Sequence, residues 1–265
     1  YKVVYNDNTS VYSLVECDYV AQVGDKKYES VQEAVDAAQS GDTVYQIKDL
    51  DLDLDDSTLV LNKYHAFVSV IGKDITFDMN GHTMTVLGIE QNGTIIFYSE
   101  GGKLTLKDSM DNGSITTQGS GFYWMFFNDG EMVIESGNYV FEGNPECDMF
   151  YANKDGMTIT GGNFTQVNGS WMFNTTGNGN YKITVTGGTF NRYFVGGVAY
   201  GENPWGEAYL PVEYALASNG NGPWTVKDSV AYIEKNIGKV NAKIGYATFE
   251  DAYKAAVKIV GGEQY

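Results

Sequence analysis

A short pattern that ends in a glycine turn recurs through the middle of this chain and sets the strongest limit on its fold. Each copy has an apolar, a polar and another apolar residue, then a turn with glycine, then an aromatic residue or isoleucine. The clean copies are Leu104–Ile115, Met132–Tyr139, Met157–Phe164 and Ile183–Phe190, and Ile75–Met84 is a looser one. They begin at 104, 132, 157 and 183, which are 28, 25 and 26 residues apart. A strand with one buried face, followed by a turn that requires glycine, explains the pattern.

A second strand is predicted in each period. Its segments are rich in aromatic residues and methionine: Thr94–Tyr98, Trp124–Asn128, Asp148–Ala152 and Trp171–Asn174. No helical pattern separates the strands, so βαβ units are excluded. Short strands at this spacing predict an all-β chain folded as a parallel β-helix, also called a β-solenoid, in which each coil stacks on the coil below.

The two ends of the chain resemble each other. Tyr28–Ala38 aligns with Tyr246–Ala256 at a constant offset of 218 residues, and each segment has a helix N-cap signal. Upstream, Val3–Val15 resembles Glu213–Val226, and both have the pattern of a hairpin with a polar turn. The offset predicts a fragment of a tandem array that holds the tail of one module, a complete module and the start of the next. The alternative is an accidental likeness between two alanine-rich helices.

Three motifs together carry a resemblance to a known family. They are the Thr-x-Thr-Gly-Gly-x-Phe copies, the segment Asp78–His82 and the opening Val23–Thr43. Over roughly residues 19–200 the chain resembles the pectate-lyase-like right-handed β-helix modules that are repeated in large surface proteins of gut-associated Gram-positive bacteria. β-Helices of this kind carry both enzymes and adhesins, so the resemblance does not decide the function.

The resemblance implies a right-handed parallel β-helix with an N-terminal capping helix and a small C-terminal β segment that leads into the next repeat. The expected boundaries are a tail of the preceding module at 1–18, the β-helix module at 19–200 with its capping helix at about 30–40, a connecting β segment at 201–240, and the start of the next module at 241–265 with a helix at about 248–259.

The charge balance excludes some partners. The chain has 34 acidic and 17 basic residues, a net charge of −17, which repels nucleic acid and anionic membranes. Neutral sugars, cationic surfaces and proteins remain as partners. No segment approaches the ~20 consecutive apolar residues of a membrane span. Cys17 and Cys147 lie far apart and form no metal-binding pattern, so both are predicted to be buried or free thiols, with a disulfide between them as the alternative.

The acidic run Asp49–Asp56 is the most conspicuous candidate for a metal site. Calcium binding requires several carboxylates to converge, whereas alternate residues of an extended strand spread over ~20 Å. A strand with Leu50, Leu52 and Leu54 facing inward and the aspartates in water explains the run better. No metal site and no cofactor are therefore predicted.

Catalysis is disfavoured by the scarcity of suitable groups. Pectate-lyase-like enzymes need a basic residue, and the only arginine, Arg192, lies at the end of the regular coils. Glycoside hydrolysis needs two facing carboxyl groups, for which Asp108 and Glu135 on adjacent coils are the candidates. His65 and His82 have no recognisable serine, cysteine or metal companion. The chain is predicted to be non-catalytic, and a polysaccharide-degrading glycoside hydrolase or lyase is the alternative.

The aromatic strands supply the candidate binding residues. Alternation predicts an inward ladder of Phe126, Phe150 and Phe173. The opposite face then carries an apolar stripe, predicted to be exposed and to bind a partner: Met125, Phe127, Met149, Tyr151 and Met172. In the alternative, the connection from about 196 to 230, with Trp205, Tyr209 and Trp224, folds back and covers this stripe.

These observations predict a module of a bacterial surface adhesin, because tandem repetition converts weak contacts into avidity. The expected protein is secreted, cell-wall-anchored or otherwise at the surface of a gut commensal bacterium. Its expected partners are a host immunoglobulin, mucin or other glycoprotein and the neighbouring repeats of the same chain, without nucleic acid and without membrane insertion. A passive spacer is a further alternative.

Overall fold

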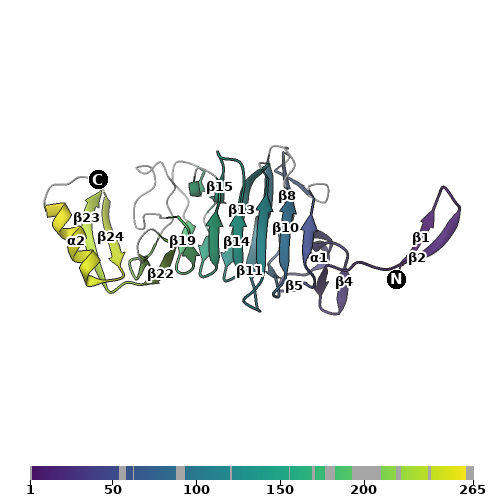
Figure 1. Cartoon of the computed structure of the whole chain (residues 1–265), viewed down its shortest axis with the longest axis horizontal. Helices are drawn as coiled ribbons and strands as arrows, with labels where there is room; N and C mark the ends of the chain where they lie inside the picture. Colours follow the sequence, from purple (N-terminus) through teal and green to yellow (C-terminus); the bar gives the residue numbers. More distant parts are fainter. Residues whose placement is uncertain are drawn as a thin grey trace.

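The chain forms an elongated coil of stacked strands (Figure 1). The computed structural model describes residues 2–53, 58–61, 63–87, 93–119, 121–154, 156–168, 171–176, 183–192, 210–218, 222–237 and 240–260. It is an all-β parallel β-solenoid of about 4 turns, which confirms the predicted parallel β-helix. Within the described ranges the helices are α1 (Val31–Ala37) and α2 (Phe249–Val260), neither long and apolar enough to cross a membrane.

Two sheets form the walls of the solenoid. The first has eight strands, in the spatial order β21 (Tyr214–Ala217), β22 (Trp224–Asp228), β20 (Thr189–Phe190), β17 (Asn163–Gln166), β14 (Asn138–Phe141), β12 (Ser114–Gln118), β10 (Thr83–Leu87) and β6 (Leu50–Leu52). Strands β6 to β20 pair in parallel, one from each coil.

The second sheet has 12 strands and comprises two segments of each coil, because β11 and β13 run through both. Its strands are β3 (Ala21–Val23), β4 (Lys26–Tyr28), β5 (Thr43–Gln46), β7 (Thr58–Val60), β8 (Tyr64–Ile71), β9 (Ile75–Asp78), β11 (Thr94–Lys107), β13 (Phe122–Ile134), β15 (Asp148–Ala152), β16 (Met157–Ile159), β18 (Trp171–Thr175) and β19 (Ile183–Val185).

The predicted repeat is the register of the solenoid. Leu104 pairs with Met132, Met132 with Met157, and Met157 with Ile183, so the first residues of the four clean copies lie one above another. Each copy therefore contributes one coil segment to the same wall.

The paired glycines of the repeat are needed for two different reasons. A Cβ on Gly161 would lie 2.1 Å from the carbonyl oxygen of Glu135 in the neighbouring coil, so the first glycine permits close stacking. Gly162 has φ +102°, a conformation that side chains rarely adopt. Gly187 and Gly188 repeat this division, with a Cβ on Gly187 1.9 Å from the Thr160 carbonyl oxygen and φ +101° at Gly188.

Helix α1 covers the first coil. It begins at the predicted cap, where the Ser30 side chain accepts a hydrogen bond from the Glu33 amide at 3.1 Å. Val31, Ala34 and Val35 are buried, and the helix contacts β3, β4, β5 and β8. It thereby shields the core at one end of the solenoid, as the predicted capping helix requires.

Antiparallel segments follow at both ends of the solenoid. Strand β22 pairs antiparallel with β20 and with β21. Strands β23 (Ala231–Ile237) and β24 (Val240–Tyr246) form a second hairpin, against which α2 packs. At the other end β1 (Lys2–Asn6) and β2 (Val11–Val15) form the hairpin expected there. The assignment of the end segments to neighbouring modules stays a prediction.

Stacked phenylalanines fill the core. The rings of Phe97, Phe126, Phe150 and Phe173 follow one another at centroid distances of 5.8, 4.9 and 4.9 Å. A second column of Tyr139, Phe164 and Phe190 stacks beside it, at 5.3 and 4.9 Å. The expected inward ladder of Phe126, Phe150 and Phe173 is therefore present.

Candidate functional site

The predicted stripe is not an exposed surface. Met125 and Met149 are fully buried and Met172 is 4% exposed, and all three belong to the main core together with Phe126 and Phe150. Strict alternation fails because two adjacent side chains face inward at this point of each coil. A strand that bends can aim consecutive side chains to one side, as a bulge does.

Phe127 and Tyr151 do lie on the outer side of the wall, in a separate aromatic cluster. Their rings stack at 5.0 Å, and Trp124 contacts them at 5.0 and 5.1 Å. Phe127 is 4% exposed, whereas Tyr151 and Trp124 are only partly buried. The correction therefore removes the three methionines from any contact surface and leaves Tyr151, beside Trp124, as the accessible part of the stripe.

The covering segment also differs from the expected one. Val60 at the end of β7 and Tyr64 at the start of β8 belong to the outer aromatic cluster. Trp224 lies in β22, where it pairs with Phe190. Trp205 and Tyr209 lie outside the described residues. The β7–β8 hairpin therefore covers part of the outer wall.

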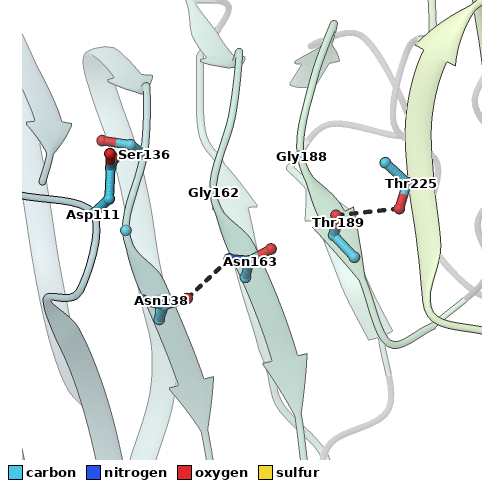
Figure 2. A pocket seen from close by; sticks show the side chains of 9 residues that line it. Asp111, Ser136, Asn138, Gly162, Asn163, Gly188, Thr189 and Thr225 are labelled. Atoms are coloured by element: carbon cyan, nitrogen blue, oxygen red, sulfur yellow. Dashed lines mark hydrogen bonds between the residues drawn. The ribbon is translucent and has the colours of Figure 1, made fainter.

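A groove runs along the glycine turns on another side of the solenoid (Figure 2). It has a volume of about 350 Å³ and crosses several stacked coils. Polar side chains and glycines line it: Asp111, Ser136, Gly137, Asn138, Gly162, Asn163, Gly188, Thr189 and Thr225. The side chains come from equivalent positions of successive coils because the register places Asn138, Asn163 and Thr189 in one row.

Hydrogen bonds between the coils hold these side chains in place. Asn163 Nδ2 donates to Asn138 Oδ1 at 2.9 Å, and Asn138 Nδ2 donates to the Gly113 carbonyl oxygen at 2.9 Å. Thr189 and Thr225 share a hydroxyl–hydroxyl hydrogen bond of 3.2 Å (Figure 2). The groove thus presents a fixed row of neutral donors and acceptors, and Asp111 is the only carboxylate among its lining residues.

The predicted carboxyl pair does not form in the expected way. Asp108 is 3% exposed, and its carboxylate accepts hydrogen bonds from the backbone amides of Gly81, Met110 and Gly113. Its backbone amide donates to Ser136 Oγ at 2.8 Å on the next coil. Glu135 is exposed. Asp108 therefore stabilises the turn, and its neighbour across the coils is Ser136.

The acidic run behaves as expected where it is described. Leu50 is buried and Asp51 and Asp53 are exposed. Asp49 Oδ1 accepts a hydrogen bond from the Thr83 amide, which lowers the pKa of Asp49, and the Nδ1 atom of His82 lies 3.4 Å from it. Residues 54–57 lie outside the described residues. The described part of the chain holds no group of three or more residues that could bind a metal ion.

The cysteines are free thiols. Cys17 is partly exposed and Cys147 is buried. Burial raises the pKa of Cys147 to about 12, and the nearby Asp148 and Glu146 add to this effect. The Cys147 thiol is therefore protonated at neutral pH and unreactive.

A second polar feature lies within the outer aromatic wall. Trp124 pairs with Asp148, and Asp148 pairs with Trp171, so the three residues form one column across successive coils. Asp148 is 3% exposed, whereas both tryptophans are partly buried. Asp148 Oδ2 accepts a hydrogen bond from Asn174 Nδ2 at 2.8 Å, and Oδ1 is buried without a hydrogen-bond partner.

Burial dominates the electrostatics of Asp148. It raises the pKa of this carboxyl to about 7, against smaller lowering effects from the Asn174 hydrogen bond and from the Trp124 indole. The contact with the indole is too poorly aligned to count as a hydrogen bond of Oδ1. A buried acid with a strongly shifted pKa is a typical mark of a functional site.

Sequence reasoning missed both features, although each left a signal. The groove residues Asn138, Asn163 and Thr189 directly follow the glycine of successive repeats, a position we had assigned only to turn formation. Asp148 takes the place that tryptophan occupies in the segments beginning at Trp124 and Trp171.

Comparison with known proteins adds no identification, because no family model, no curated protein and no solved structure matches this chain.

Proposed function

We propose that this chain is a non-catalytic binding module of a bacterial surface adhesin, and that it recognises the glycan part of a host glycoprotein such as mucin. The groove along the glycine turns carries the proposal. Its row of amide and hydroxyl groups matches the needs of a polyhydroxylated chain, which offers donors and acceptors at regular intervals. Neighbouring strands are ~4.8 Å apart, so the row offers a new set of polar groups at each step.

The charge and the fixed geometry support a neutral glycan as the ligand. A net charge of −17 opposes an anionic polymer but does not affect a neutral one. The Asn163 amide is already oriented by Asn138, so little side-chain entropy is lost when a sugar hydroxyl binds. Repetition of such a shallow site in an array would raise a weak affinity to a useful avidity.

The groove favours binding over glycoside hydrolysis. A hydrolase of the usual type requires two carboxyl groups on either side of the scissile bond. Asp111 is the single carboxylate on the groove, and the carboxylate of Asp108 is engaged by three backbone amides. A polysaccharide-degrading enzyme therefore remains the alternative with less support in the described part of the chain.

The test is binding of the purified chain to immobilised mucin, to the same mucin stripped of its O-glycans, and to immunoglobulin. We expect saturable binding to mucin that is lost with the glycans. Asn163→Ala should weaken this binding by about tenfold, which corresponds to about 1.4 kcal/mol. Thr165→Ala is the matched control, because Thr165 is exposed on the same strand but does not line the groove.

Binding that persists after glycan removal would contradict the proposal and favour a protein epitope. Absence of binding to all three surfaces would favour the spacer. Depolymerisation of a polysaccharide by the wild-type chain would favour the enzyme.

A further inference from the structure

We propose that Asp148, Trp124 and Trp171 form a binding site for a small cation that carries a trimethylammonium group, of the choline type. The site lies on the outer aromatic wall and is distinct from the glycan groove. The inference does not rest on the proposed function, and it starts from one unusual feature, a buried carboxylate oxygen without a partner.

Other buried acids in the described ranges have compensating groups. Asp78 has Lys107 Nζ at 3.6 Å from its carboxylate, and Asp129 has Lys154 Nζ at 3.2 Å. Asp108 accepts hydrogen bonds from three backbone amides. Asp148 has only the Asn174 amide, on one oxygen. Because an uncompensated buried charge is costly, an external cation would supply what the chain itself does not.

The surroundings of Asp148 select an organic cation. Two tryptophans flank the carboxyl along the column, and the ring of Tyr151 lies 5.1 Å from that of Trp124. Aromatic faces attract cations through their quadrupole, and indole does so most strongly. Calcium instead requires six to eight oxygen ligands, whereas Asp148 offers one free carboxylate oxygen. The acidic surface further enriches cations near the site.

The single free oxygen also discriminates among organic cations. A guanidinium binds a carboxylate best through two parallel hydrogen bonds, but Asn174 occupies Oδ2. A primary ammonium has three N–H donors, of which Oδ1 would satisfy one while the aromatic rings leave the others poorly paired. A trimethylammonium group has no donor to satisfy, and its methyl groups pack against indole while its charge offsets the carboxylate.

The test is a titration with choline, observed by NMR on the indole N–H signals of the four tryptophans. The matched probe is 3,3-dimethylbutan-1-ol, the uncharged carbon analogue of choline. We expect choline to shift the Trp124 and Trp171 signals saturably, and the alcohol to bind at least about tenfold more weakly. Phosphocholine distinguishes a free cation from a phosphate-bearing head group, and it should bind more weakly because the acidic surface repels phosphate.

Three variants decide whether the named side chains form the site. Asp148→Asn keeps the shape of the side chain and should lower choline affinity about tenfold, whereas Asp25→Asn makes the same charge change at an exposed turn and should not. Trp171→Phe keeps an aromatic face and should retain most of the affinity. Equal binding of choline and the alcohol, unchanged binding in a folded Asp148→Asn protein, absence of any shift, or tighter binding of phosphocholine would each overturn the proposal.

Discussion

Replacement of Phe150 by alanine tests the packing on which the solenoid depends. Phe150 is fully buried, and its ring stacks on Phe126 and on Phe173 with both centroid distances 4.9 Å and both interplanar angles 15°. A third ring, Phe164, meets it edge-on at 5.2 Å. Phe→Ala in a core costs ~3–5 kcal/mol, and each aromatic pair adds ~0.5–1.5 kcal/mol beyond its buried area. We expect a loss near the upper end, about 5 kcal/mol, because Phe150 stacks on both sides.

The assay is urea unfolding, followed by far-UV circular dichroism and by tryptophan fluorescence so that coincidence of the two curves tests for a single transition. Val167→Ala is the control, since Val167 is 52% exposed and its truncation should change the free energy of unfolding by less than ~0.5 kcal/mol. A loss below ~1 kcal/mol in Phe150→Ala would refute the reasoning, because it would show that Phe150 does not stack between two coils.

Two further predictions concern Asp148 and the repeat glycines. Because burial raises the pKa of Asp148 from 3.8 to about 7, the folded state holds its proton more tightly than the unfolded state, and this group should cost stability as the pH rises from about 4 to about 7. The free energy of unfolding of the wild type, relative to Asp148→Asn, should therefore fall by roughly 4 kcal/mol between these limits, and a pH-independent difference would contradict the burial of this carboxyl. Gly161→Ala should destabilise the protein more than Gly24→Ala, because the new Cβ at 161 would lie 2.1 Å from the Glu135 carbonyl oxygen whereas the one at 24 has no atom within 4 Å. Equal losses in urea unfolding would show that close stacking does not explain the first glycine of the pair.

The candidate sites show how far the period-2 rule reaches. Alternation placed Phe126, Phe150 and Phe173 inside and Phe127 and Tyr151 outside, as the structure has them. It failed for Met125 and its equivalents, because the wall bends there and two neighbouring side chains point inward. The bend depends on how one coil packs against the next, which a local pattern does not describe.

The sequence by itself determined the solenoid, its period and its capping helix. The repeat fixes where each strand begins, the paired glycines require a turn in every coil, and Ser30 marks the start of α1. Only the tertiary structure decided which side chains meet across coils. Stacking aligns Asn138 with Asn163 in one row and places Asp148 between two tryptophans. Such contacts join residues about one coil apart in the chain, so they follow from register and from the bend of the wall rather than from local sequence.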